Sequence, residues 1–275
     1  CICCIVPFWL LVAISISNEQ DIYTYGYQLI PKRIDFTAYT YIMKNPTQIL
    51  MAYRTTILST VIGTVLSVFL MSMTSYALAV PSYRHRKKIS FYLFFTMMFS
   101  GGLVPSYILN TQYLHLGNSF WVLVLPSLVN PWYIFLIRTF FQGIPGALRE
   151  SAKLDGAGEF RTFFQIMLPL SKPVMATVAL MTALVKWNDW YTVLLYITDE
   201  DLMTLQYLLQ RIMLQIELLR DYAVMGGAGQ LDNVEVPSET IRMAMAVVAA
   251  GPMLVVFPFF QKYFAKGLTV GSVKG

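Results

Sequence analysis

Residues 150–173 read ESAKLDGAGEFRTFFQIMLPLSKP, a polar segment that lies between long apolar stretches and is too long for a minimal connector. Its first half favours a short helix, in which Ala152, Gly156 and Glu159 are spaced to share one face. Gly156 and Gly158 can break this helix and turn the chain. We therefore expect a helix and a turn, with small residues where another surface can approach closely.

The second half, EFRTFFQIML, offers another short amphipathic helix. We expect it to end near Leu168, because the residue before Pro169 disfavours helical backbone. Such a helix–turn–helix either docks into a partner protein or rests on lipid headgroups. The pattern alone leaves both interpretations open.

The composition around this segment indicates a membrane protein. The chain has 275 residues, of which 56% are hydrophobic and only 13% charged, whereas a soluble domain is about one quarter charged. The net charge of +5 does not indicate nucleic-acid binding, because the charges lie in short groups between apolar runs and form no basic face with interleaved aromatic residues.

Three cysteines, Cys1, Cys3 and Cys4, open the chain within an apolar run that has no nearby His or carboxylate. This setting favours apolar packing over metal binding. The run has no basic n-region and no A-x-A cleavage site, so we interpret it as a truncated first span rather than a signal peptide.

Six apolar runs approach the length of about 20 residues that a helix needs to cross a bilayer. The sequence therefore predicts an all-α membrane protein with a single transmembrane domain over residues 1–275, because the runs lack the alternation of barrel strands. The expected spans are residues 2–17, 55–80, 89–109, 119–137, 173–196 and 243–260.

The connections differ in charge. Twelve basic residues fall on one side of the membrane, and seven fall in the longer loops on the other. The positive-inside rule places the first set, with both termini, residues 149–172 and the tail 261–275, in the cytoplasm. The first set is Arg84, Arg86, Lys87, Lys88, Arg138, Arg149, Lys153, Arg161, Lys172, Lys262, Lys266 and Lys274.

Glycine and proline recur inside the apolar runs, for example at Gly101, Gly102, Pro126, Pro131 and Pro252. They indicate either simple helix packing or a bundle that bends, and composition does not separate the two.

The segment at residues 150–173 resembles the EAA loop of permease subunits of bacterial ATP-binding-cassette (ABC) importers. The family pattern is E-A-A, three residues, G, nine residues and I-x-L-P, and Ser151 replaces the usual alanine. The residues that carry the resemblance are Glu150, Ala152, Asp155, Gly156, Ile166, Leu168 and Pro169.

The final residues, YFAKGLTVGSVKG, resemble the terminus of the six-span maltose-type permease subunit. The stretches MFSGGLVPSYIL, RTFFQGIP and LPLSKP are similar to the branch that imports complex oligosaccharides, such as lipo-oligogalacturonide and alginate. The resemblance covers nearly the whole chain. It implies a type I ABC importer permease fold with six transmembrane helices and a cytoplasmic coupling helix.

The same resemblance implies roles for two further sets of residues. In the family, the EAA loop docks into a cytoplasmic ATPase subunit, and the tail lies against the ATPase dimer. The expected coupling residues are Glu150, Ser151, Ala152, Asp155, Gly156, Ala157 and Pro169, and the expected tail contacts are Gly267, Gly271 and Ser272.

The implied partners are a second permease subunit, a different chain in this branch, two ATPase subunits, an extracytoplasmic sugar-binding protein and the lipids of the bacterial inner membrane. The chain has no G-x-x-x-x-G-K-[ST] phosphate loop. We therefore expect ATP and Mg²⁺ to bind to the partner ATPases, and we expect no cofactor, metal site or catalytic residue in this chain. His85 and His115 fall on opposite sides of the membrane and cannot form a site together.

The long extracytoplasmic loop, residues 198–240, is acidic and contains a helical pattern in LMTLQYLLQRIMLQIELL. In maltose-type relatives the equivalent loop reaches into the binding protein, so we favour docking over a helix that only caps the bundle.

The fifth apolar run contains the stretch KWNDWYTVLLY, in which Lys186 and Asp189 are three residues apart and can pair on one helix face. Charges inside a span are expensive and suggest function. Trp187, Asn188, Asp189 and Trp190 are candidates for the translocation path. The competing interpretation is anchoring at the membrane interface, with the Lys186 side chain extended to the outer surface.

Two other classes remain as alternatives to a transport subunit. An intramembrane enzyme using Asp189 would need a second polar catalytic group at similar depth. A membrane scaffold or sensor would not explain the coupling segment and the tail together.

Overall fold

The computed structural model describes residues 2–44, 46–224 and 238–267. All regular elements within these ranges are helical, apart from one isolated bridge between Ser17 and Ile34. The expectation of a helical protein is therefore confirmed.

The chain forms two compact units. The first comprises Cys1–Thr56, Asp189–Leu194 and Asp199–Val255, and the second comprises Ile57–Asn188, Leu195–Thr198 and Val256–Gly275. Unit 1 contains α1 (Ile2–Ser15), α2 (Glu19–Tyr25), α3 (Thr37–Ile42), the short η4 (Glu200–Leu202) and α13 (Leu205–Val224). Three helices contribute residues to both units: α4 (Pro46–Ala79), α12 (Tyr191–Tyr196) and α14 (Ser238–Gly267).

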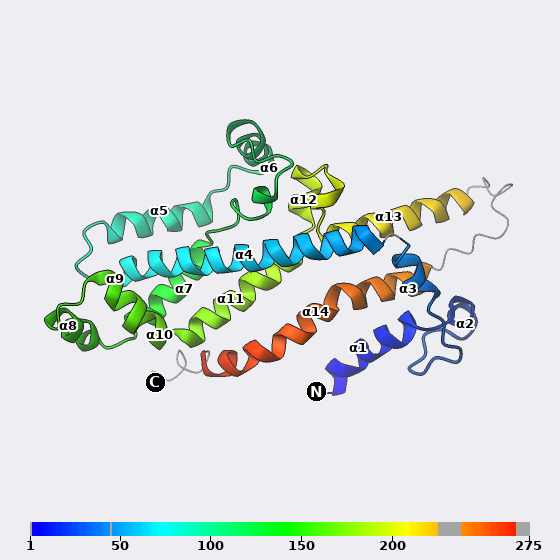
Figure 1. Ribbon diagram of the computed structural model, residues 1–275, viewed down its shortest axis with the longest axis horizontal. Helices are drawn as coiled ribbons and strands as arrows, with labels where there is room; N and C mark the ends of the chain where they lie inside the picture. The colour runs from blue at the N-terminus through cyan, green and yellow to red at the C-terminus, as the bar shows by residue number, and fades with distance from the viewer. Residues whose placement is uncertain (1, 45, 225–237, 268–275) are drawn as a thin grey trace. The chain divides into compact units, whose positions relative to one another are not determined.

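Unit 2 contains the remaining helices (Figure 1). They are α5 (Arg86–Met98), α6 (Leu103–Ile108), η1 (Leu109–Tyr113), η2 (Phe120–Leu123), α7 (Pro131–Gln142), α8 (Gly146–Leu154), α9 (Glu159–Thr162), η3 (Phe163–Met167), α10 (Leu168–Leu170) and α11 (Lys172–Trp187).

Two helices among the described residues are long and apolar enough to cross a bilayer, namely α4 and Glu239–Pro258 within α14. The number rises to four if each of two bent helix pairs is one span. These four overlap the second, third, fifth and sixth expected spans, but the last bent pair also includes Glu159–Leu170, which was expected in the cytoplasmic loop, and it ends at Trp187. The first expected span contains only a shorter apolar helix, Val6–Ser15.

The third expected span, residues 89–109, is divided into two helices. The axis turns by 116° between Arg86–Met98 and Leu103–Tyr113. Gly102 precedes α6 with a φ of +87°, a backbone conformation that glycine adopts without steric cost. The glycine pair at 101 and 102 therefore allows this change of direction.

The fourth expected span, residues 119–137, is also not one continuous helix. It begins with the single turn η2, and a new helix, α7, starts at Pro131. The Asn130 side-chain oxygen accepts a hydrogen bond from the Trp132 backbone N–H at 2.9 Å. An Asn cap followed by Pro in the first turn is a strong helix start, and it explains the break.

The core of unit 2 joins α4, α7, η3 and α11 (Figure 1). Its most deeply buried side chains include Met71, Ile134, Ile137 and Val178, each no more than 1% exposed. The Ser75 hydroxyl adds a hydrogen bond of 2.8 Å to the Ile134 carbonyl oxygen. The π-helical turn η3, within the segment 150–173, thus packs directly on α4.

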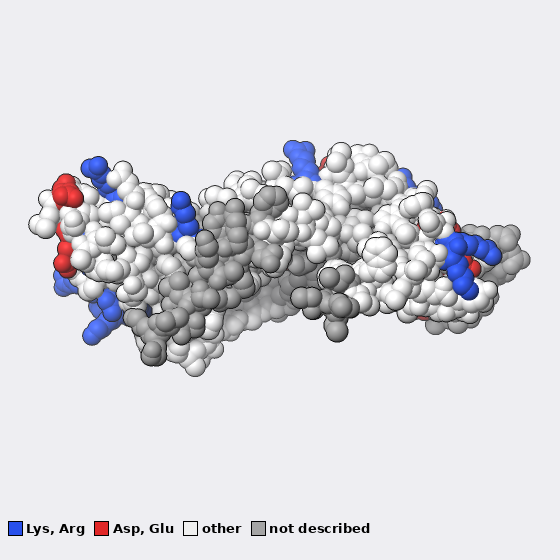
Figure 2. All heavy atoms as spheres, turned by 90° about the horizontal axis from the view of Figure 1, so that it is seen from below, with Lys and Arg blue, Asp and Glu red and all other residues white. Residues whose placement is uncertain are grey.

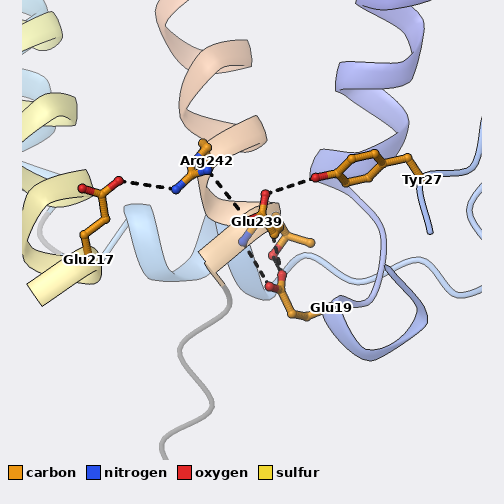
Figure 3. A network of polar contacts seen from close by, with 6 residues as sticks. Glu19, Tyr27, Glu217, Glu239 and Arg242 are labelled. Atoms are coloured by element: carbon orange, nitrogen blue, oxygen red, sulfur yellow. Dashed lines mark hydrogen bonds and ion pairs between the residues drawn. The ribbon is translucent and has the colours of Figure 1, made fainter. Parts of the chain in front are cut away.

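In unit 1, the start of α14 is held by a polar network (Figure 3). The Glu19 carboxylate accepts hydrogen bonds from the backbone N–H groups of Glu239 and Thr240, both at 3.0 Å, and from the Thr240 hydroxyl at 2.7 Å. The Tyr27 hydroxyl donates to Glu239, and Arg242 lies 3.4 Å from Glu217. Glu19 therefore acts as an N-terminal cap from a distant part of the sequence.

The helix expected within residues 198–240 is confirmed as α13, with Leu205, Leu208, Leu209 and Ile216 buried. Part of this loop, residues 225–237, lies outside the described residues.

Candidate functional site

The polar segment that follows α7 forms the helix and turn that its sequence predicts. The helix α8 ends at Leu154, and Gly156 follows with a φ of +77°. The Ala157 N–H donates to the Ala152 carbonyl at 2.9 Å, and the Gly156 N–H donates to the Lys153 carbonyl at 3.0 Å. This pair of hydrogen bonds is a Schellman motif, which places a left-handed residue directly after the helix. The backbone geometry at this position therefore favours glycine.

The expected common face of Ala152, Gly156 and Glu159 does not form. Ala152 is 6% exposed, whereas a Cβ added at Gly156 would meet nothing within 4 Å. The reason is that α8 stops before Gly156 and Glu159 begins a separate helix.

The second helix continues beyond its expected end at Leu168. Residues Phe163–Met167 form a π-helical turn, in which the Leu168 N–H donates to the Phe163 carbonyl, and α10 then runs through Pro169 to Leu170. The wider π turn changes the hydrogen-bond register just before the proline, where an N–H donor is missing. The axis turns by 81° between Glu159–Leu170 and α11.

Most of the expected coupling residues lie on the surface. Glu150, Ser151, Asp155, Gly156 and Pro169 are exposed, Ala157 is half-buried and Ala152 is buried. Figure 2 shows charged side chains gathered at the end of unit 2 where α8 lies. Two large apolar side chains stand out in this polar setting, because Leu154 is 90% exposed and Phe160 is 70% exposed. These side chains are available for contact with another protein or with lipid.

Tyr76 of α4 connects this segment to the bundle. Its hydroxyl donates to the Glu159 carboxylate, which also forms an ion pair of 2.7 Å with Lys153. The hydrogen bond from Lys153 and then the one from Tyr76 lower the pKa of the Glu159 carboxyl below its ordinary value. The ring of Tyr76 lies 5.3 Å from that of Phe163. Sequence reasoning missed Tyr76, because nothing distinguishes it from the other aromatic residues of the apolar runs.

The four candidates for the translocation path divide at the end of α11. Trp187 is buried, and the exposed Asn188 donates its side-chain amide to the Leu184 carbonyl at 2.8 Å. Asp189 accepts from the Thr192 N–H at 3.0 Å, and Trp190 is 40% exposed. Asn188 and Asp189 thus satisfy backbone groups at helix ends, and this role of Asp189 gives no support to an intramembrane enzyme.

The expected placement of Lys186 is wrong in two respects. Because α11 ends at Trp187, Lys186 and Asp189 do not share a helix face. Lys186 also does not extend to an exposed surface of its unit, since it is 6% exposed and donates a hydrogen bond of 2.7 Å to the Ser127 hydroxyl.

The tail residues are only partly described. Gly267 is the last residue of α14, and Gly271 and Ser272 lie outside the described residues. Within the described part of the chain, no three His, Cys, Asp or Glu side chains are grouped to hold a metal ion.

Residues 48–270 match the model of the family described as binding-protein-dependent transport system inner membrane component. Two similar proteins come from Bacillus subtilis strain 168. Protein LplC is 38% identical over 271 residues, which cover 98% of this chain and 90% of LplC. The polygalacturonan/rhamnogalacturonan transport system permease protein YtcP is 38% identical over 276 residues, which cover 99% of this chain and 93% of YtcP.

A solved structure shares the fold. It is a chain from a bacterial ABC transporter involved in the import of the acidic polysaccharide alginate, with a TM-score of 0.81 and 28% sequence identity. The similarity covers 95% of this chain and 91% of that one. The type I ABC importer permease fold is therefore confirmed. The match over most of the chain and the two relatives at 38% identity agree, and this protein belongs to the family of binding-protein-dependent transport system inner membrane components.

Proposed function

We propose that this chain is a transmembrane permease subunit of an ATP-driven oligosaccharide importer. It forms half of the translocation path and transmits ATPase movements through residues 149–172. The observation that carries the proposal is the similarity over nearly its whole length to YtcP, whose name specifies polygalacturonan and rhamnogalacturonan transport, and to a chain of an alginate importer.

The coupling role is supported by the geometry of α8. Ala152 of α8 is buried, while Leu154 and Phe160 expose apolar surface and are next in sequence to the ion-paired Lys153 and Glu159. A rigid turn at Gly156 holds the two helices of the segment in a fixed relation. These features suit a segment that inserts into a socket of an ATPase subunit.

The assembly follows from this role. We infer a second permease subunit of different sequence, two ATPase subunits that bind ATP and Mg²⁺, and an extracytoplasmic sugar-binding protein. We further infer six spans in the bacterial inner membrane, with both termini and residues 149–172 cytoplasmic. Gly267, Gly271 and Ser272 then lie near the ATPase dimer, and a cysteine introduced at Ser272 should cross-link to an ATPase subunit.

Reconstitution of the importer tests the proposal. The chain is co-expressed with its partner permease, ATPase and binding protein, and uptake of labelled oligosaccharides into proteoliposomes is measured. We expect uptake that requires ATP and the binding protein, and no ATP hydrolysis by the purified chain alone. An assembled complex that moves no oligosaccharide would refute the transport role.

A further inference from the structure

Unit 2 contains a cavity of about 430 Å³ between α4, α5, α11 and the segment that leads into α7. This volume lies in the range of small-molecule sites, about 300–1,000 Å³. The side chains that matter for its chemistry are Ser67, Met71, Ser127, Asn130, Thr182 and Lys186. The cavity therefore combines hydroxyl groups, an amide, a thioether and one ammonium group. The described residues that line it include no acidic side chain.

Two of the lining hydroxyls lack a partner. Ser67 is 1% exposed and Thr182 is 7% exposed, and neither hydroxyl oxygen has a hydrogen-bond partner among the described residues. Thr60 and Thr64, on the same face of α4 as Ser67, also carry buried hydroxyls without a partner. Buried polar groups in native proteins are almost always hydrogen-bonded, so these hydroxyls need a polar partner, which a water molecule or a ligand can supply.

Lys186 brings positive charge to the same cavity. Its ammonium group donates to Ser127 at 2.7 Å, and the side chain is 6% exposed. A buried cation in surroundings of low polarity strongly favours a nearby negative charge. The cavity is thus better suited to a ligand that carries a carboxylate than to a neutral one.

Gly63 of α4 makes this placement of Lys186 possible. A Cβ added at Gly63 would lie 2.6 Å from the Cδ and Cε atoms of Lys186 and 2.8 Å from its Nζ. Glycine inside a helix is unfavourable relative to alanine. Its presence at this point is explained by the passage of the lysine side chain across the helix.

We propose that this cavity binds a carboxylate-bearing sugar unit of the transported oligosaccharide, with Lys186 facing the carboxylate and Ser67 and Thr182 facing sugar hydroxyls. This inference rests on the proposed transport function and adds the substrate class and the residues that select it. A lysine that only ties α11 to Ser127 would account for one hydrogen bond. It would leave the two unpartnered hydroxyls and the cavity itself unexplained.

The test is equilibrium binding to the purified complex of this chain, its partner permease and the ATPase subunits. The probes are labelled trigalacturonate and its methyl ester, which carries a methyl group on each carboxyl group and therefore no negative charge. We expect the wild-type complex to bind the acid about tenfold or more tightly than the ester, since hydrogen bonds to charged groups are stronger than neutral ones.

In Lys186→Met, the acid should lose much more affinity than the ester, so that the two probes bind about equally. Lys186→Arg should retain part of the preference, because it keeps the charge. Gly63→Ala should also reduce the preference, because the added methyl displaces the ammonium group. The matched control is Gly251→Ala in α14, where an added Cβ meets nothing within 4 Å, and it should behave as wild type.

Three results would overturn the proposal. They are equal loss of acid and ester binding in Lys186→Met, an unchanged preference in both Lys186→Met and Gly63→Ala, and no binding of either probe by the wild-type complex. Uptake of oligosaccharides by the complete importer, measured in parallel, tests the transport function separately. An importer that carries sugars but shows any of these results would retain the proposed function and lose this site.

Discussion

The hydroxyl of Tyr76, in the long helix α4, donates a hydrogen bond to the carboxylate of Glu159, the first residue of α9. A core helix and the proposed coupling segment are thereby joined through a single side chain, and ring packing against Phe163 strengthens the same connection. Motion of the coupling segment must either carry α4 with it or break this contact.

Tyr76→Phe keeps the ring packing and removes only the hydroxyl. We expect a loss of about 1 kcal/mol at this contact. The variant should reach normal levels in the membrane. In the reconstituted importer, substrate should stimulate its ATP hydrolysis less strongly than in wild type. The packing control is Phe141→Leu, because the ring of Phe141 lies 6.2 Å from that of Tyr76. This substitution should lower the stability of the protein more than it weakens the stimulation of ATP hydrolysis. Unchanged stimulation in Tyr76→Phe would show that the hydrogen bond does not transmit motion.

The Glu159 contact should be sensitive to acid. Lys153 and Tyr76 lower the pKa of this carboxyl from its ordinary value of 4.5, so its stabilising contribution is complete above that value and is lost as the pH falls through the lowered pKa. The thermal midpoint of wild type should therefore exceed that of Glu159→Gln at pH 6, and the difference should shrink below about pH 4.5. A difference that is constant with pH would contradict this.

Gly156 allows a sharp comparison between two substitutions. Its positive φ costs a residue with a branched side chain about 1–2 kcal/mol, whereas Asn tolerates this conformation. We expect Gly156→Leu to weaken ATPase retention and sugar uptake at normal membrane levels, and Gly156→Asn to retain most of both. Because an added Cβ meets no atom of this chain, equal loss in both variants would point to contact with the ATPase instead of backbone geometry.

Leu154 should contribute to docking but little to folding, because it is 90% exposed. Leu154→Ser is expected to reduce co-purification of the ATPase subunits several-fold, which corresponds to about 1 kcal/mol. Leu214→Ser, at a 57% exposed position of α13, makes the same change in the loop that we propose to be extracytoplasmic, and it should leave ATPase retention unaltered. Full retention with Leu154→Ser would remove this residue from the interface.

Glu19 is expected to stabilise the start of α14. Glu19→Ala removes the acceptor of three hydrogen bonds and should lower the free energy of unfolding by about 1 kcal/mol, as for the loss of a helix cap. Glu19→Gln keeps an acceptor and should show a smaller effect in the same thermal unfolding measurement. Identical midpoints for wild type and Glu19→Ala would exclude a capping role.

Local patterns in the sequence predicted the local structure well. The spacing of apolar residues specifies α13, and a glycine after a polar helix specifies the turn at Gly156. Both features depend on neighbouring residues only, so no knowledge of the tertiary fold is needed.

Breaks within the apolar runs were harder to place. The hydrophobicity of a run shows that it suits a lipid environment, but it does not show where a helix changes direction. Residues 89–109 and 119–137 were therefore each predicted as one span. The cap at Asn130 is visible in the sequence as Asn directly before Pro, which signals a helix start. The prediction of a single span gave more weight to the apolar character of the run. The π turn before Pro169 has no comparable sequence signal.

Long-range contacts could not be predicted. The contact of Tyr76 with Glu159 joins residues that are 83 positions apart, and the hydrogen bond of Lys186 with Ser127 joins residues 59 apart. The expectation that a lysine in a span extends its side chain to the membrane surface assumes that water is the best available environment for the ammonium group. The expectation fails where the tertiary structure supplies a hydroxyl group as a hydrogen-bond partner.

The space that Gly63 leaves for Lys186 has an evolutionary consequence. A mutation at either position changes the effect of a mutation at the other, because a side chain at 63 displaces the end of the lysine side chain at 186. The two positions, which are more than 120 residues apart in the sequence, should therefore vary together among members of the family. Lineages that replace Gly63 are expected to have lost the lysine first, and with it any preference for charged cargo.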